Sequence, residues 1–109
     1  MRILIVIINM YLMMTVSYPA NKADEVVKKF VEVEEKYPQE DRIASSVFPG
    51  GVYSDDDGVN TVTITDVPEG KMADAINSSY KIMNEFRNIE GYKYKIRPLL
   101  SIEEAMATL

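Results

Sequence analysis

Three cations alternate with other residue types near the end of the sequence. Lys93, Lys95 and Arg97 occupy every second position of residues 92–100, and side chains two apart in a strand lie on the same face. Such a row would supply positive charge to a small anionic molecule. It would serve equally well as edge protection, because lysines on an edge strand deter pairing with other chains. The sequence leaves both interpretations open.

Catalytic chemistry would have to use a restricted set of side chains. The chain has no His, no Cys and no Trp, which excludes Ser-His-Asp catalysis, thiolate nucleophiles, imidazole-bound zinc and disulfides. We predict Tyr11, Tyr53 and Thr63 as polar contacts to a ligand, beside the cationic row. A Tyr next to Lys or Arg could polarise a substrate, although Tyr titrates far above neutral pH unless strongly perturbed.

Three adjacent aspartates at positions 55–57 are the remaining cluster of chemical interest. A calcium loop of the EF type needs acidic groups at alternating positions and a distal Glu, and this segment has neither. Asp and Gly are common in tight turns, and Asp57-Gly58 is a typical hairpin pair. We therefore predict a turn over residues 54–58, no metal site and no cofactor.

Composition sets the broad class of the protein. The 109 residues predict one domain, and 47% hydrophobic with 27% charged residues is typical of a soluble globular protein. The net charge of -5 argues against a nucleic-acid partner, which would require a surplus of Lys and Arg.

The first half of the chain predicts two strands separated by a helix. Residues 11–18 alternate without a charged residue, which predicts a central strand with both faces covered. Asn21 is the predicted cap of a helix that ends at residues 36–37, before Pro38. Residues 42–54 predict an edge strand with a bulge or bend at Pro49-Gly50-Gly51.

The second half repeats this pattern. Residues 59–67 are rich in β-branched types and predict a strand. Asp66 is the predicted cap of a helix that covers residues 72–88, where apolar residues recur at steps of three and four. Residues 92–100 form the last strand, and the Ser101…Glu104 capping box predicts a short helix over residues 102–108.

This order of elements predicts an α+β, ferredoxin-like βαββαβ fold. It is an antiparallel sheet with two helices on one face, the first and third strands central, and a short C-terminal helix. We expect the other face to carry Tyr11, Met13, Thr15 and the Thr61–Thr65 row. A face this apolar is too large to leave in water, so we predict that two sheets face each other in a homodimeric α/β barrel.

Two segments carry a resemblance to a known superfamily. They are YLMMTVSYPANKADEVVKKF, which opens with Tyr-Leu and passes through Tyr-Pro, and IEGYKYKIRPLLSIEEAMATL, with Pro-Leu-Leu, a capping residue and Glu-Glu-Ala. In these features the chain resembles small members of the dimeric α/β-barrel superfamily over residues 10–109. The motifs are structural signals and specify no chemistry.

The resemblance implies two classes of function. One is a small-molecule-binding or structural homodimer, with the ligand between the sheets. The alternative is a cofactor-independent enzyme, similar to monooxygenases or isomerases, acting on a small hydrophobic substrate in the barrel cavity. Relatives of that kind commonly use His, Trp or a positioned Asn, and the absence of His and Trp argues against the haem and quinone-forming routes.

Residues 1–9 admit several interpretations. We predict an N-terminal extension or a prolonged first strand, followed by a single domain over residues 10–109. The apolar run within residues 1–16 also resembles a secretory signal or a membrane anchor, and Met10 could be the true start. Cleavage near Ala20 would delete the central strand, so we predict a cytoplasmic protein with no membrane association.

Overall fold

The computed structural model describes residues 10–38 and 43–107, in a βαββαβ order that ends with a third helix. The strands are β1 (Met10–Tyr18), β2 (Ser45–Asp55), β3 (Gly58–Val67) and β4 (Lys93–Leu100). The helices are α1 (Ala23–Lys36), α2 (Met72–Met83) and α3 (Ile102–Ala107), with single 3-10 turns η1 (Ala20–Lys22) and η3 (Asn84–Phe86).

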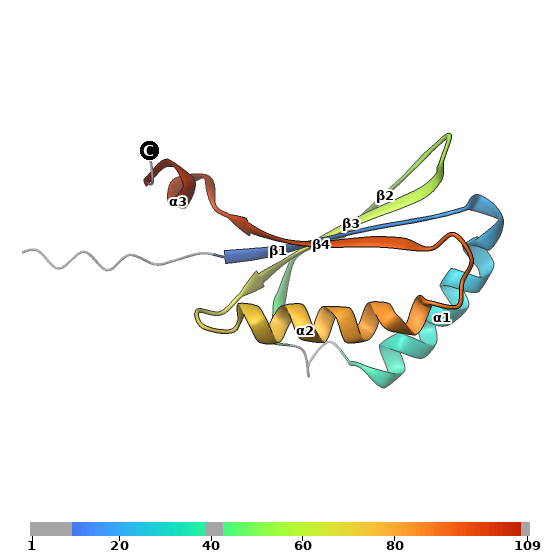
Figure 1. Cartoon of the computed structure of the whole chain (residues 1–109), viewed down its shortest axis with the longest axis horizontal. Coiled ribbons are helices and arrows are strands. Elements are labelled where there is room, and N and C mark those ends of the chain that lie inside the picture. The colour runs from blue at the N-terminus through green and yellow to red at the C-terminus, as the bar shows by residue number, and fades with distance from the viewer. Residues whose placement is uncertain (1–9, 39–42, 108–109) are drawn as a thin grey trace, which may run out of the picture.

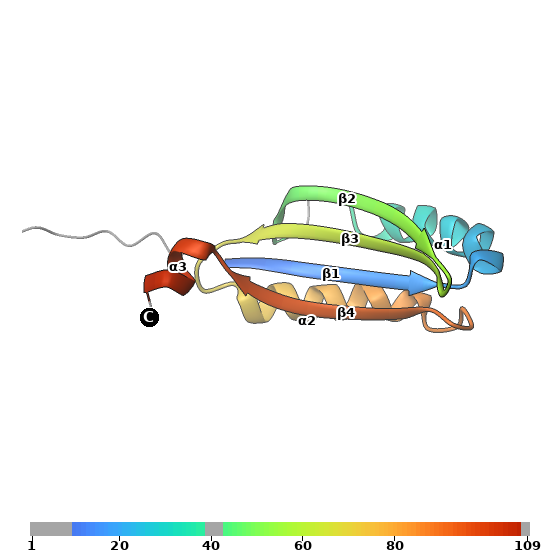
Figure 2. The same ribbon diagram turned by 90° about the horizontal axis from the view of Figure 1, so that it is seen from above.

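The four strands form one antiparallel sheet in the order β2-β3-β1-β4 (Figure 2). The uncharged strand β1 is central, next to β3, and the strand with the cationic row is at an edge, as predicted. α1 and α2 both lie on one side of the sheet (Figure 1). The predicted α+β, ferredoxin-like arrangement is confirmed.

Strand register assigns each side chain to one of the two sheet faces. Leu12, which is buried, and Met14 pair with Thr65 and Thr63 of β3. The same two β1 residues pair with Pro98 and Ile96 of β4, so all of these side chains share the face that α1 and α2 cover. We call the opposite side the outer face.

The edge strand β2 is irregular where the sequence predicts it. Its pairing with β3 shifts between Ser46 and Phe48, and again between Phe48 and Gly51. Pro49 lies in the second of these intervals and cannot donate a ladder hydrogen bond. The predicted bulge at Pro49-Gly50-Gly51 is therefore confirmed, and it bends β2 relative to β3.

The two helices contribute to the core in different ways. α2 packs against β1 and β4, whereas α1 packs mainly against η3. One core cluster joins both helices to the end of β1, and a smaller one joins Leu12, Val67 and Ala75. The larger cluster contains the buried residues Tyr18, Val26, Val33, Ile82, Met83, Phe86 and Ile89.

The predicted helix caps are partly wrong. Asn21 lies inside the 3-10 turn η1, and no side chain caps α1, whose N-cap position is Lys22. Asp66 lies in β3, which continues to Val67, and α2 begins only at Met72. The Ser101 cap is confirmed, because the Glu104 N–H donates to Ser101 Oγ over 3.1 Å.

Several predictions fall outside the described residues. They are the nature of residues 1–9 and the end of the last helix at residue 108. The predicted start of the second strand at residue 42 is wrong, because residues 43 and 44 form a bend and β2 begins at Ser45. The single domain and the cytoplasmic location also stay predictions. In residues 10–38 and 43–107, no helix has the length and apolar character needed to cross a bilayer.

Candidate functional site

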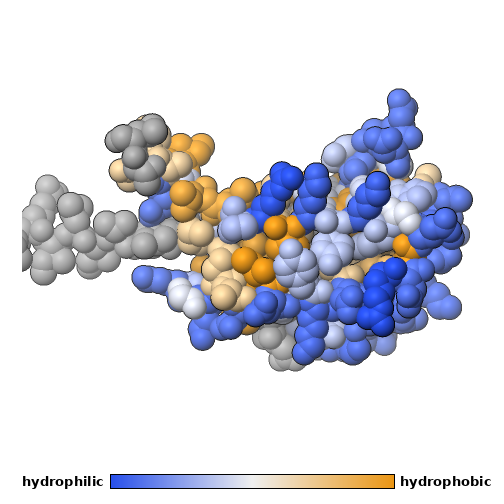
Figure 3. All heavy atoms as spheres, viewed as in Figure 1, coloured by the Kyte–Doolittle hydropathy of each residue, from blue (hydrophilic) through white to orange (hydrophobic). Residues whose placement is uncertain are grey.

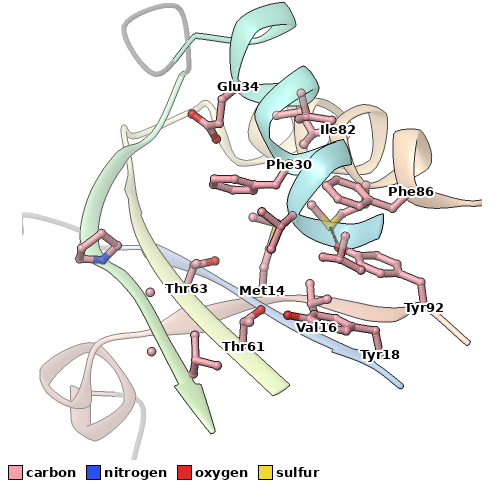
Figure 4. Close-up of a pocket in the computed structure, with 18 of the residues that line it drawn as sticks. Met14, Val16, Tyr18, Phe30, Glu34, Thr61, Thr63, Ile82, Phe86 and Tyr92 are labelled. Atoms are coloured by element: carbon pink, nitrogen blue, oxygen red, sulfur yellow. Dashed lines mark hydrogen bonds between the residues drawn. The ribbon is translucent and has the colours of Figure 1, made fainter. Parts of the chain in front are cut away.

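A cavity of about 380 Å³ lies on the helix side of the sheet, between α1 and the β2–β3 hairpin (Figure 4). We call it the helix-side cavity. Phe30 projects from α1 over one side of it, and Thr61 and Thr63 line the opposite side from β3. Most of its remaining lining is apolar: Met14, Val16, Val26, Val27, Val33, Val52, Ile82, Met83 and Phe86.

The cavity exists because α1 stands away from the β2–β3 half of the sheet. Lys36 at the end of α1 lies with its Nζ 2.7 Å from Glu85 Oε1, in η3. The Tyr37 hydroxyl donates to the same carboxylate oxygen over 3.3 Å. These contacts attach α1 to η3, and Val27 and Phe30 remain 60% and 53% exposed instead of packing on β3.

This exposure corrects one sequence-based expectation. An amphipathic helix normally buries its whole apolar stripe, which in α1 would include Val27, Phe30 and Val31 together with Val26 and Val33. Only Val26 and Val33 are buried, and Val31 is 53% exposed. Val27 and Phe30 face the helix-side cavity, so part of the stripe is available to a ligand.

An aromatic stack closes one end of the cavity. The Phe86 and Tyr92 rings are nearly parallel with centroids 4.8 Å apart, and Tyr18 stacks on Tyr92 at 6.3 Å. The Tyr92 hydroxyl donates to Met83 Sδ over 3.6 Å. Burial raises the pKa of Tyr92 far above its ordinary value. The Tyr92 hydroxyl therefore stays protonated at neutral pH and cannot serve as a base there.

Few polar groups reach the cavity. Thr61, Thr63 and Thr65 contribute hydroxyls from alternate positions of β3, and Thr65 Oγ1 already donates to the Leu12 carbonyl over 3.3 Å. Glu34 is the carboxylate among the described lining residues, and its side chain points from α1 past Phe30 (Figure 4). The lining suits a mainly apolar molecule and disfavours an anion.

A second concavity, of about 350 Å³, lies on the outer face. We call it the outer groove. Lys93, Lys95 and Arg97 of β4 line one side, and Tyr53 of β2 lines the other. Asn60, Ser17 and Thr15 lie between them on β3 and β1. Figure 3 shows hydrophilic side chains that rise from the sheet on the side away from α1 and α2.

The structure brings together four of the six side chains that the sequence analysis named. Tyr53, Lys93, Lys95 and Arg97 line the outer groove. Tyr11 is on the same face but does not line the groove; its pairing partners are Asp66 and Leu99, toward the other end of the sheet.

Thr63 is placed on the opposite side of the sheet from the cationic row. It pairs with Met14 and lines the helix-side cavity, so our expectation that the Thr61–Thr65 row belongs to the outer face is wrong. The cause is a geometric one. The register of β3 against β1 puts its Thr residues on the helix side and Val62 and Ile64 on the outer face.

Most of the helix-side cavity and part of the outer groove, including Ser17 and Asn60, were not predicted from the sequence. Asn60 was not singled out, and its Nδ2 is buried without a hydrogen-bond partner among the described residues. Asn60 could have been singled out because it is a polar residue within a strand rich in β-branched residues. In the described part of the chain, no group of three acidic side chains is close enough to hold a metal ion.

Comparisons with known proteins agree with this architecture. No protein-family model and no curated protein matches the sequence. A crystal structure described as a dimeric ferredoxin-like protein, from an uncultured marine organism, matches with a TM-score of 0.56 and 8% identity. The match covers 88% of this chain and 97% of that one.

A second solved structure is a NIPSNAP family protein with unknown function from Agrobacterium tumefaciens. It aligns with a TM-score of 0.42 and 16% identity, over 85% of this chain and 90% of that one. The topology of the sheet and the first of these structures together identify the fold of this chain as ferredoxin-like.

Proposed function

We propose that this protein is a homodimer that binds a small, mainly apolar molecule in the helix-side cavity. The observation that carries the proposal is the cavity itself, of about 380 Å³ and lined chiefly by apolar side chains. Small-molecule sites are commonly concave, mostly apolar and of this order of volume, with a few polar groups that orient the ligand. A purely structural role would leave such a cavity without a purpose.

The lining indicates the class of ligand. Phe30 and the Tyr92–Phe86 stack offer flat aromatic surface, and the hydroxyls of Thr61 and Thr63 offer hydrogen bonds on one side. The Glu34 carboxylate at the α1 side opposes negative charge. We expect a neutral molecule with an apolar ring and one or two polar substituents.

The homodimer is supported by the outer face of the sheet. Met13, Val62 and Ile64 are only partly buried there, and Phe48 is 44% exposed. A second copy placed on this face by a two-fold axis would cover the same residues in both subunits. The ferredoxin-like neighbour is described as dimeric, which supports the same assembly for this chain.

The enzymatic alternative stays a prediction. The buried Tyr92 hydroxyl is held protonated at neutral pH, because burial raises its pKa, and so it is not available as a base. We therefore favour binding over catalysis as the function of the cavity. The cytoplasmic location also stays a prediction. The central place of β1 in the sheet supports it, because cleavage of a secretory signal near Ala20 would remove this strand.

Binding of a neutral fluorescent probe, Nile red, tests the proposal. We expect saturable binding to the wild-type protein, and at least about tenfold weaker binding to Thr63→Phe, which places an aromatic ring in the space that the probe would occupy. Val31→Phe adds the same ring to an exposed position that does not line the cavity, and it should bind like the wild type.

A second variant guards against misfolding of Thr63→Phe. Val27→Trp enlarges a 60% exposed residue of the cavity wall and should also weaken binding. Native mass spectrometry of freshly purified protein gives the assembly and any retained molecule in one measurement. Equal Nile red binding by all four proteins would overturn the cavity proposal, and a monomer at micromolar concentration would overturn the dimer.

A further inference from the structure

The outer groove collects hydrogen-bond donors and positive charge in an otherwise acidic protein. The chain carries 17 acidic and 12 basic residues, yet no acidic side chain is among the described residues that line the groove. Three of the basic residues, Lys93, Lys95 and Arg97, form one row along it. No ion pair joins any of the three to another described residue.

The register defines how the donors are arranged. Across the sheet, Tyr53, Asn60, Ser17 and Lys93 form one row of side chains on the outer face. In the next row, Thr15 lies beside Lys95. Alternate residues on a strand are about 6.8 Å apart, so an oxyanion above Ser17 or Thr15 can reach both the cationic edge and the hydroxyls.

Asn60 distinguishes this groove from a protected sheet edge. Its Nδ2 is buried and makes no hydrogen bond to the described residues, although a buried unpaired donor is costly. Asn60 lies on β3, which is an interior strand, so edge protection explains the lysines but not this amide. Asn60 lines the groove, and a turn of its amide toward the groove would let Nδ2 donate to a bound oxyanion. An oxyanion accepts hydrogen bonds from amide, hydroxyl, ammonium and guanidinium groups together.

We propose that the outer groove binds a small oxyanion, the phosphate or carboxylate group of a small molecule, through Asn60, Lys93, Lys95 and Arg97. The anion site lies on a single subunit, whereas its effect on dimer stability rests on the proposed homodimer. Two outer faces joined by a two-fold axis bring both cationic rows into the space between the sheets, where bound anions would offset their mutual repulsion. The oxyanion therefore stabilises the dimer as well as the subunit.

Thermal unfolding and sedimentation, each in chloride, phosphate or citrate at equal ionic strength, test this site. Inorganic phosphate and citrate are the two probes, and they separate a phosphate preference from a carboxylate preference. We expect a higher Tm and a tighter dimer in at least one of them than in chloride, because a ligand of the folded dimer stabilises it.

Two variants with matched controls locate the effect. Asn60→Asp keeps the size of the side chain but replaces the unpaired donor by a carboxylate, and Lys95→Gln removes one charge of the row. Each should weaken anion binding at least about tenfold, as expected for a lost charge-assisted hydrogen bond. Asn77→Asp and Lys81→Gln, at exposed positions of α2, make the same changes elsewhere and should bind like the wild type.

These measurements distinguish failure of the oxyanion site from failure of the proposed homodimer. Equal Tm and equal dimer affinity in all three salts would overturn the oxyanion site while leaving the dimer intact. Equal losses in Lys95→Gln and Lys81→Gln would overturn it too, because they would indicate general charge screening. A monomer that still binds phosphate, with sensitivity to Asn60→Asp, would support the site and overturn its link to the dimer.

Discussion

Lys36 at the end of α1 is joined to Glu85 in η3, with Nζ 2.7 Å from Oε1. This ion pair connects residues that are 49 positions apart in the sequence. It attaches α1 to the end of the α2 segment, on the helix side of the sheet, and so helps to define how far α1 stands from β3. The distance between α1 and β3 is the width of the helix-side cavity.

The first prediction concerns the pH dependence of this contact. The hydrogen bond from Lys36 lowers the pKa of Glu85 below its usual value of 4.5, and the same bond raises the pKa of Lys36 above 10.5. A lowered folded-state pKa contributes stability at pH values above 4.5 and loses it as the pH falls through the folded-state pKa. A raised pKa on Lys36 contributes stability that is lost above pH 10.5.

Glu85→Gln should therefore lower Tm at pH 7 by no more than a few degrees, because the pair is exposed to solvent. The difference from the wild type should shrink as the pH falls below 4.5 and through the lowered pKa of Glu85. Calorimetry across this pH range measures it, and Glu90→Gln, at an exposed position, is the control. A difference of equal size at pH 7 and pH 3 would show that the ion pair is not responsible.

The second prediction concerns the outer face. Ile64 lies at its centre, between Phe48 of β2 and Met13 of β1. Ile64→Asp would bury an unpaired charge in the proposed dimer interface, so we expect dimer affinity to fall by at least about 100-fold. Analytical ultracentrifugation measures this loss.

Val31→Asp introduces the same charge at a 53% exposed position of α1 and should leave the dimer unchanged. Circular dichroism of both variants checks that each is folded. Dimerisation of Ile64→Asp with unchanged affinity would mean that a second copy covers some other surface.

The third prediction concerns the hairpin between β2 and β3. Gly58 has a φ of 125°, and a Cβ at this position would overlap the backbone carbonyl of Tyr18. Gly70 has a φ of 79°, and nothing lies within 4 Å of the equivalent Cβ. Gly70→Ala should cost about 1 kcal/mol from backbone strain alone.

Gly58→Ala should cost more, by about 1–3 kcal/mol, because the backbone must also move away from Tyr18. Urea unfolding of both variants gives the comparison. Similar losses at the two glycines would show that the hairpin does not pass close to the end of β1.

The fourth prediction concerns the smaller core cluster. Leu12 is 2% exposed and packs with Val67 and Ala75. Leu12→Ala should reduce the free energy of unfolding by about 2–5 kcal/mol, the usual range for a truncated core leucine. Leu100→Ala makes the same change at a 52% exposed residue and should cost less than about 1 kcal/mol. Equal costs would place the core elsewhere.

The arrangement of the strands could be predicted from the sequence, because particular residues distinguish central strands from edge strands. An uncharged alternating run marked β1 as central, and Pro49 and the cationic row marked β2 and β4 as edges. The caps at Asn21 and Asp66 failed because local capping preference does not reveal where a 3-10 turn or a longer strand displaces the helix start.

The candidate sites were less accessible from the sequence. Alternation shows which residues share a face, but it does not show which face the helices cover, and so Thr63 was assigned to the wrong side. The position of α1 depends on its packing in the larger core cluster and on the Lys36–Glu85 pair, which are contacts between residues far apart in the chain. The exposure of Phe30 follows from these tertiary contacts. The donors of the outer groove come from all four strands, and no short motif contains them.

The bulged part of β2 forms one wall of the helix-side cavity while contributing to neither core cluster. Replacement of Pro49 or Val52 would therefore reshape the wall without removing a buried side chain. On the α1 and α2 side, by contrast, Val33, Ile82 and Phe86 belong both to the cavity lining and to the larger core cluster. The shape of the cavity can therefore be altered from the edge strand with little change in the free energy of unfolding, whereas a change on the helix side would alter both.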